Sequence, residues 1–312
     1  MHPVEEDRYV IPTNALEAFV NIINTWIRSN VVGALVPGRQ RIGKSWAVAY
    51  YIKNFRKWLG DSVGMVSAEV LPHKIITETL FWGDLLRTMG HPTTKRNPED
   101  RRSLFIGRLV AAGARSAQKK VVIFLDEAQL LDDMLFKLLI GVHNEMWRVY
   151  HIKCAWILVG QPELETVAAT YIAEGKRQIV GRFMSDTYVF QPLLGFDDFT
   201  YALECFDQLL RHPLNGPFFT EHYAPVAWAA GYRLKSDDQL IYERITNARQ
   251  EMSLPESSGM TMQGFTTLMN HILTKQLPKL KAGDRLTKEM VDESIEQTNC
   301  MIFESQEALL SV

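Results

Sequence analysis

One eight-residue segment limits the folds open to this chain more than any other feature. Gly38–Ser45 reads GRQRIGKS and matches the pattern G-x-x-x-x-G-K-[ST]. It follows the apolar run VVGALV at 31–36, an expected buried strand, and precedes a helical pattern that continues to about residue 59. In that context, backbone N–H groups and the helix N-terminus point toward an anion. The segment therefore predicts a phosphate-binding loop in an α/β fold.

The residues of this loop have distinct expected roles. Lys44 is expected to reach the β- and γ-phosphates of a nucleotide, and the Ser45 hydroxyl to ligate Mg²⁺. The full set of expected phosphate and nucleotide contacts is Gly38, Arg39, Gln40, Arg41, Ile42, Gly43, Lys44, Ser45 and Trp46.

A second motif places two carboxylates at the end of an apolar strand. The run VVIFL at 121–125 leads directly to Asp126 and Glu127. Ligands of parallel α/β sheets bind at the carboxyl ends of the strands, so we expect both side chains near the phosphate loop. Asp126 is predicted to hold Mg²⁺, and Glu127 to orient or deprotonate the attacking water.

Two further polar residues are candidates for the same chemistry. Gln161 ends the apolar run CAWILV at 154–159 with Gly160, where its amide can bond the γ-phosphate or the attacking water. Arg182, in the segment GRF, is predicted to reach the nucleotide of a neighbouring subunit, because a planar guanidinium suits developing phosphoryl charge. Arg177 is a competitor for that role.

Strands and helices alternate as far as residue 195, which predicts a five-stranded parallel sheet flanked by helices. After residue 195 only helical patterns remain, so we expect a boundary at Gly195-Phe196. The expected domains are an N-terminal segment 1–13, an α/β domain 14–195, an all-α lid 196–300 and a tail 301–312. The first helix is expected at 14–28, capped by Asn14. The other expected strands are 63–67 and 187–190, and the other expected helices are 74–89, 98–118, 132–148, 163–173, 197–211, 236–252, 260–279 and 287–299.

Composition excludes several other classes of protein. The three cysteines are far apart and no histidine pattern suits a metal, which disfavours a zinc module, a disulfide framework and any metal besides nucleotide Mg²⁺. No signal peptide and no membrane-spanning run is evident, so a soluble, cytosolic protein is expected. The net charge of −2 means that a polyanionic partner would need a local basic patch.

These motifs, in this order, resemble those of an AAA+ ATPase. More closely, VIPT, GRQRIGKS, FLDEAQLL, ILVGQPEL, GRF and QPL resemble the TniB/TnsC regulators of transposition, which serve TnsABC-type and CRISPR-associated transposons. The resemblance covers about residues 8–195 and implies that Val10, Ile11 and Pro12 line an adenine pocket. ATP and Mg²⁺ are the implied cofactors.

The resemblance also implies a switch controlled by nucleotide. Such proteins assemble head-to-tail on duplex DNA, as rings or helical filaments, with the ATP site between subunits. A targeting protein of the TniQ or TnsD type loads the assembly, which then recruits a transposase of the TnsB or TniA type. Hydrolysis drives disassembly. The implied location is the bacterial cytoplasm.

Contacts to DNA are expected from a local group of residues between the second and third strands. Lys74, Thr94, Lys95 and Arg96 fall at a helix end or in an inter-helix loop, where they can grip phosphates without reading bases. A filament would multiply such weak contacts.

The sequence departs from the family pattern in two places. No basic residue lies in 258–263, where many relatives carry a lid sensor; Arg244 and Arg249 are only nearby in sequence. Gln161 stands where threonine is common. Two alternatives therefore stay open: an AAA+ adaptor acting on protein partners without DNA, and an ATP-binding scaffold with little turnover.

Overall fold

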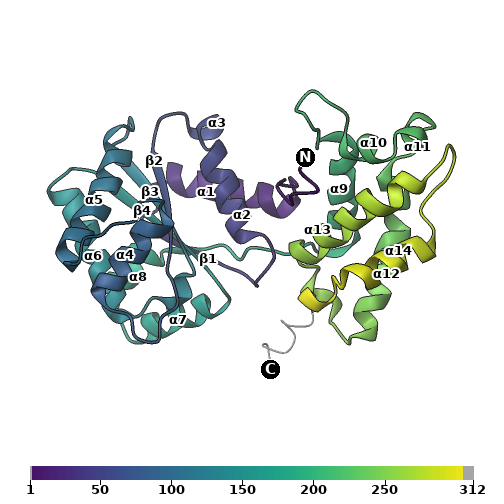
Figure 1. Cartoon of the computed structure of the whole chain (residues 1–312). Coiled ribbons are helices and arrows are strands. Elements are labelled where there is room, and N and C mark those ends of the chain that lie inside the picture. The colour runs from purple at the N-terminus through teal and green to yellow at the C-terminus, as the bar shows by residue number, and fades with distance from the viewer. Residues whose placement is uncertain (1, 305–312) are drawn as a thin grey trace. The chain divides into compact units, whose positions relative to one another are not determined.

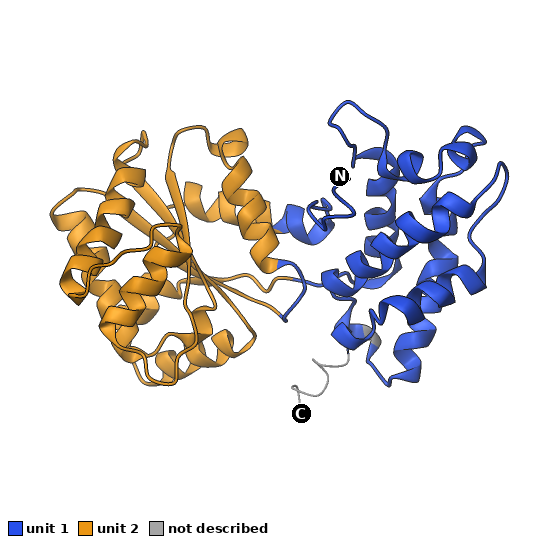
Figure 2. Cartoon of the chain, in the orientation of Figure 1, with its two compact units in different colours: residues 1–18, 39–43, 191–312 blue, residues 19–38, 44–190 orange. Residues whose placement is uncertain are grey.

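The computed structural model describes residues 2–304, which form two compact units (Figures 1 and 2). The α/β unit comprises Phe19–Gly38 and Lys44–Phe190. The helical unit comprises the described residues up to Ala18, Arg39–Gly43, and those from Gln191 onward. The chain therefore passes into the second unit a few residues before the expected boundary at 195. Of the expected tail 301–312, residues 301–304 are described, and Met301 and Glu304 are buried; residues 305–312 lie outside the described residues.

The α/β unit contains one five-stranded sheet in the order β2-β3-β4-β1-β5, with every neighbouring pair parallel. Such an order needs helical crossovers, which cover the sheet on both faces. The central strands β3 and β4 are almost completely buried, whereas β2 lies at an edge. The strands are β1 Gly33–Pro37, β2 Gly64–Glu69, β3 Lys120–Asp126, β4 Lys153–Gly160 and β5 Asp186–Thr187.

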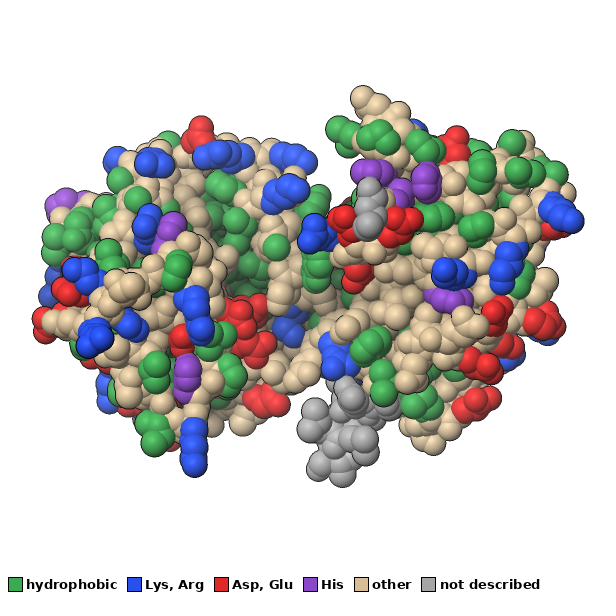
Figure 3. All heavy atoms as spheres, in the orientation of Figure 1, with side chains coloured by type: hydrophobic (Ala, Val, Ile, Leu, Met, Phe, Trp, Pro, Cys, Tyr) green, Lys and Arg blue, Asp and Glu red, His purple; other side chains and the backbone are tan. Residues whose placement is uncertain are grey.

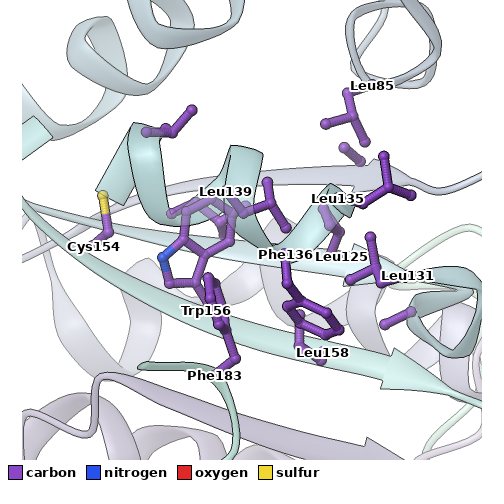
Figure 4. Packing of buried hydrophobic residues seen from close by; sticks show 14 of the residues in the cluster. Leu85, Leu125, Leu131, Leu135, Phe136, Leu139, Cys154, Trp156, Leu158 and Phe183 are labelled. Atoms are coloured by element: carbon purple, nitrogen blue, oxygen red, sulfur yellow. The ribbon is translucent and has the colours of Figure 1, made fainter. Parts of the chain in front are cut away.

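Aromatic and leucine side chains fill one face of this sheet (Figure 4). Trp156 on β4 packs against Phe183, with ring centroids 5.5 Å apart, and Phe136 packs against the same ring at 5.3 Å. The helices before β5 are α1 Asn14–Arg28, α2 Lys44–Asn54, α3 Arg56–Leu59, α4 Glu78–Thr88, α5 Pro98–Ala114, the 3₁₀ turn η1 Ala128–Leu130, α6 Asp133–Arg148, α7 Glu163–Ala173 and α8 Arg177–Phe183.

The predicted strands and most predicted helices of this unit are confirmed, with local corrections. The helical pattern to residue 59 is broken at Phe55 into α2 and α3. The cap of α1 is Thr13, whose hydroxyl accepts from the N–H of Leu16 at 3.3 Å; the prediction of Asn14 was wrong, and Asn14 is the first helical residue. Helix α8, which carries Arg182, was not predicted because its seven residues are too short for a periodic pattern.

The helical unit has a core of its own, built around Phe199, Phe206 and Phe265. No helix among residues 2–304 is long and apolar enough to cross a membrane. The elements of the helical unit after residue 190 are α9 Gly195–Gln208, α10 Phe219–Tyr223, α11 Pro225–Ala229, η2 Leu234–Asp237, α12 Asp238–Glu251, η3 Glu256–Ser258, α13 Met262–His271, the π-helical turn η4 Ile272–Gln276, η5 Leu277–Lys279 and α14 Lys288–Thr298.

Buried carboxylates fix the loops of the helical unit. Asp207 accepts from the backbone N–H groups of Leu234 and Lys235, both at 3.0 Å. Asp237 accepts from the N–H of Leu286 at 3.1 Å and from the Tyr232 hydroxyl at 2.8 Å. Burial raises the pKa of both carboxyls, and these hydrogen bonds oppose the rise.

Candidate nucleotide site

The two predicted magnesium ligands meet in the α/β unit. The Ser45 hydroxyl, on the first turn of α2, donates to Oδ2 of Asp126 at 2.6 Å. Asp126 ends β3, and the backbone N–H of Glu127 donates to its other oxygen at 3.0 Å. A hydroxyl and a carboxylate are the hard oxygen ligands that Mg²⁺ takes beside nucleotide phosphates, so this donor set fits the ion.

Lys44 lies at the start of α2, where a phosphate would sit. Its side chain is buried, and its ammonium donates to the carbonyl of Gly38 at 2.5 Å. Gly38 is anchored in turn, because its N–H donates to the carbonyl of Gly160 at 3.1 Å. The ammonium is thus held among backbone groups at the carboxyl ends of β1 and β4.

The carboxylate of Glu127 is held by two glutamine amides. Gln129 Nε2 donates to Glu127 Oε2 at 2.6 Å, and Gln161 Nε2 donates to the same oxygen at 3.3 Å. The backbone N–H of Gln161 donates to Gln129 Oε1 at 3.0 Å, which fixes the orientation of that amide. Glu127 itself has a left-handed backbone, with φ of 54°. Such a conformation in a non-glycine residue is uncommon and clusters at functional sites.

A third carboxylate lies beside this pair and was not predicted. Glu69 ends β2 and is in register with Asp126 on β3. Burial, together with the negative charges of Asp126 and Glu127, raises the pKa of Glu69. A bound cation would relieve this repulsion, which adds to the fit with Mg²⁺.

The middle of the phosphate loop belongs to the helical unit. The Arg39 guanidinium donates to the carbonyl of Ser258, and the N–H of Gln263 donates to the carbonyl of Arg41 at 3.1 Å. Arg41 is left-handed, with φ of 62°, and its guanidinium lies 5.0 Å from the centre of the Phe303 ring. Gly43 has φ of 100°, a conformation that glycine tolerates far better than other residues.

Arg182 is held within the α/β unit by two polar contacts. Its guanidinium donates to the carbonyl of Gln178 at 3.1 Å and to the side chain of Asn144 at 3.4 Å. The backbone behind it lies against β1, since a Cβ on Gly33 would stand 2.1 Å from the Arg182 carbonyl oxygen. Burial and the nearby Arg182 charge lower the pKa of His143. The competitor Arg177 is exposed at the start of the same helix.

Both lid arginines named from the sequence are engaged in ion pairs. Arg244 binds Asp292 through two hydrogen bonds of 2.5 and 2.9 Å. Arg249 is buried against Glu304 at 2.5 Å and donates to the Ser258 hydroxyl at 2.6 Å. Ser258 therefore links the Arg249–Glu304 pair to Arg39 of the phosphate loop within the helical unit.

The remaining predicted nucleotide contacts lie in different surroundings. Ile11 is buried in the core of the helical unit, whereas Val10 and Pro12 are half-buried. Ile42 and Gln40 lie in the loop, with Ile42 almost fully buried. Trp46 is 52% exposed on α2. Their adenine and phosphate contacts stay predictions.

The four predicted DNA contacts Lys74, Thr94, Lys95 and Arg96 are all exposed. The three cations among them form no ion pair within residues 2–304. Arg101, next along the chain, ties their loop to α4 by donating to the carbonyls of Lys95 at 2.6 Å and Thr79 at 2.7 Å.

Sequence reasoning missed Gln129 and Glu69. Gln129 follows the Asp126-Glu127 pair by two residues, and its side-chain oxygen would be 2.4 Å from a Cβ on Gly160. Glycine at 160 therefore makes room for the amide that holds Glu127. Neither residue stood out in the sequence, because single polar residues at strand ends are common.

One family model and several solved structures are similar to this chain. Residues 33–167 match the family model described as AAA domain. No curated protein sequence matched the chain. Among solved structures, the Aeropyrum pernix ORC2 protein aligns with a TM-score of 0.52 at 14% identity, covering 95% of this chain and 71% of that one. Cdc6p from Pyrobaculum aerophilum aligns at 12% identity with a TM-score of 0.43, covering 93% and 88%.

The match and the geometry concern the same part of the molecule. The phosphate loop, the Ser45–Asp126 contact and the glutamines around Glu127 all lie within residues 33–167. Residues 33–167 match the model of an AAA domain, and the chain has the fold of an AAA+ P-loop NTPase, which implies nucleotide binding.

Proposed function

We propose that this protein is an ATP-driven switch that assembles on duplex DNA and regulates transposition. The arrangement of Ser45, Asp126 and Glu127 carries the first part of this proposal, because it provides a magnesium ligand pair beside a positioned carboxylate. The order of motifs that resembles the TniB/TnsC regulators supports the second part.

The residues of the α/β unit have separate tasks in hydrolysis. Lys44 would neutralise charge on the β- and γ-phosphates, while Ser45 and Asp126 would hold Mg²⁺, which supplies charge stabilisation when bound. Glu127 would orient the attacking water and take its proton. Gln129 and Gln161 both donate to Oε2 of Glu127, so these two bonds leave Oε1 to face the water. The nucleotide in the Aeropyrum ORC2 structure, ADPNP or ADP, supports an adenine nucleotide here.

Self-assembly would complete the site in trans. Arg182 is half-buried at the end of α8. Its partners, the Gln178 carbonyl and the Asn144 side chain, are neutral, and each accepts a single hydrogen bond, so an anion could replace them. In a head-to-tail assembly this guanidinium would approach the nucleotide of the neighbouring subunit. Because nucleotide would lie at the interface, its hydrolysis would loosen the assembly.

The decisive experiment measures binding of a labelled duplex of arbitrary sequence at fixed salt, with a non-hydrolysable ATP analogue, with ADP and without nucleotide. We expect binding with the analogue alone, and its loss in Lys44→Ala. Lys53→Ala is the matched control, since Lys53 is exposed on the same helix. Equal binding in all three states would show that DNA binding does not depend on nucleotide, and would favour the alternative of an adaptor that acts on protein partners.

The trans role of Arg182 is tested on assembled protein. We expect Arg182→Ala to lower the hydrolysis rate roughly 10³-fold or more, as removal of an arginine finger does. Arg177→Ala is the matched control on the same helix. If the Arg182 variant assembles and hydrolyses at the parental rate, Arg182 is not the finger, and a defect in Arg177→Ala would assign the role to the competitor.

Binding to DNA phosphates is tested by its salt dependence. Lys95→Ala and Arg96→Ala each remove one cation, so each is expected to reduce the slope of log binding constant against log salt by about 0.9. Arg148→Ala, an exposed arginine at the end of α6, should leave the slope unchanged. An unchanged slope in all variants would move the DNA surface elsewhere.

The link to transposition is tested with a TnsB-type transposase and a mixture of target DNAs. DNA carrying the assembled protein should receive insertions in preference to bare DNA, and Lys44→Ala should abolish the preference. Nucleotide-dependent DNA binding without such a preference would keep the switch and reject the role in transposition.

A further inference from the structure

A groove runs along the free edge of the sheet in the α/β unit, and none of its lining residues is among those assigned to the nucleotide. Its floor is β2, and its walls are the α2–α3 junction on one side and α5 with the end of α4 on the other. The groove has a volume of about 570 Å³. This is within the range of about 300–1,000 Å³ typical of ligand sites.

The edge strand β2 directs some of its backbone groups into this groove. The N–H of Val70 donates to Asp126 on β3, whereas the N–H of Glu69 donates to the Thr88 side chain at 3.0 Å and so faces away from β3. Backbone direction alternates along a strand, so Met65 and Ser67 also direct their N–H and C=O groups outward. Such a row is a template for another extended strand.

Helix α5 packs closely against the first residue of β2. A Cβ on Gly64 would lie 2.2 Å from the carbonyl oxygen of Ala112, so α5 lies directly against the start of β2 with no side chain between them. Apolar groups then line both walls, with Ile52 and Phe55 on one side and Met89 on the other. These walls match the alternate side chains of an added strand, which point to opposite faces of a sheet.

The charge of the groove is predominantly positive. Arg108 and Arg115 line the α5 wall, and neither forms an ion pair within residues 2–304. They are seven residues apart, so they lie on one side of the helix about 10 Å apart along its axis. Arg56 lines the opposite wall and pairs with Asp61, the only acidic lining residue, at 3.1 Å. Figure 3 shows Lys and Arg side chains gathered over this end of the α/β unit, near α3.

We propose that this groove binds an acidic, extended segment of a partner protein, which adds as a sixth strand beside β2. The outward backbone groups of Met65 and Ser67 would provide main-chain hydrogen bonds, and the arginines would select carboxylates. Duplex DNA would satisfy the charges but has no strand edge to pair with β2, so the two features together favour a peptide.

The test uses a display library of random decapeptides selected on the full chain. We expect recovered peptides to carry Asp or Glu at alternate positions, and to slow amide hydrogen exchange at Met65 and Ser67. The double variant Arg108→Glu/Arg115→Glu should bind them at least tenfold more weakly, while Arg148→Glu should not. Both α5 arginines are exposed, so the variant is expected to fold.

A backbone variant separates strand addition from charge alone. Ser67→Pro removes an outward N–H but no bond to β3, and proline is tolerated on edge strands in this position. We expect at least tenfold weaker peptide binding in Ser67→Pro and less than a twofold change in Ser67→Ala.

Several outcomes would overturn the proposal. Recovery of no peptide, recovery of neutral or basic peptides, or unchanged binding in either variant would do so. If the α5 double variant instead fails to bind duplex DNA, the groove is a nucleic-acid surface; if it fails to self-associate, the edge is an interface between copies of this chain.

Discussion

The carboxylates of the candidate site in the α/β unit and the buried carboxylates of the helical unit lie in different surroundings. In the α/β unit, the central strands β3 and β4 are mostly apolar and buried, and Lys44, Asp126 and Glu127 come where strands end or helices begin. In the helical unit, carboxylates such as Asp207 and Glu304 are inside the core, where they fix loops. Polar side chains at strand ends can contact a ligand, whereas the buried carboxylates of the helical unit stabilise its loops through hydrogen bonds. The two units should therefore respond differently to removal of a carboxylate.

The largest expected effect is on hydrolysis. Glu127→Gln should lower the rate by roughly 10²–10⁴-fold, because general-base catalysis contributes about that much, while ATP affinity changes little. Single-turnover hydrolysis and nucleotide binding measure the two quantities. Glu163→Gln, at the exposed start of α7, is the control. If Glu127→Gln hydrolyses ATP at the parental rate, Glu127 is not the catalytic carboxylate, and the proposed difference between the carboxylates of the two units is wrong.

The matching change in the helical unit should affect stability instead. Glu304 is 1% exposed and accepts from Arg249 at 2.5 Å and from the N–H and hydroxyl of Thr261, both at 2.7 Å. Glu304→Ala should lower the free energy of unfolding by roughly 3–5 kcal/mol, since it leaves a buried guanidinium unpaired. Urea denaturation measures this.

A double-mutant cycle separates the ion pair from other effects of the Glu304 change. Arg249→Met combined with Glu304→Ala should cost less than the sum of the two single changes, because neither charge is then buried alone. Strict additivity would show that Glu304 does not brace the unit through Arg249.

A smaller effect is expected from acid on the same unit. His2 is buried against His212 and His222, with ring centroids 5.2 and 4.5 Å away. Burial, and then the charges of His222 and His212, lower the pKa of His2 from 6.5 to about 4, while Glu5 opposes this change. Between these two pH values the unfolded chain binds more protons than the folded chain. The contribution of neutral His2 to the free energy of unfolding is therefore fully present above about pH 6.5 and is lost as the pH falls toward 4.

The size of this acid effect should be roughly 1–3 kcal/mol. Hydrogen exchange of the helical unit at pH 7 and at a pH of about 4.5 measures it, and His2→Phe should reduce the difference. His151→Phe, an exposed histidine of the α/β unit, should not. An equal acid effect in the His2 variant would assign the sensitivity to other groups.

The smallest expected effect concerns the cap of α1. Thr13→Ala should cost about 1 kcal/mol of stability, because it removes the hydroxyl that accepts from Leu16. Asn14→Ala is the control and should cost less, since Asn14 is already within the helix and its amide only donates an exposed hydrogen bond to Asp198 at 2.7 Å. If Asn14→Ala lowers the free energy of unfolding more than Thr13→Ala does, Asn14 is the cap, as predicted from the sequence.

Prediction from the sequence succeeded unevenly, and the reasons are physical. The strands of the α/β unit, with helices such as α6 and α7, were predicted within a few residues, because short apolar runs mark the buried strands and a helical period marks the helices. The short helices α8, α10 and α11 were not predicted. Their five to seven residues cannot show a period of 3.6, and their stability comes from packing.

The sequence by itself determined the phosphate loop, the strand that ends in Asp126 and Glu127, and the parallel α/β class. These follow from local chemistry: glycines at fixed spacing, an apolar run and the residues next to it. Tertiary structure alone decided that Gln129 and Gln161 meet on Glu127, that Glu304 neutralises Arg249, and that arginines of α3 and α5 face one free strand edge. Each of these depends on residues brought together across strands or helices, and no pattern along the chain encodes such distances.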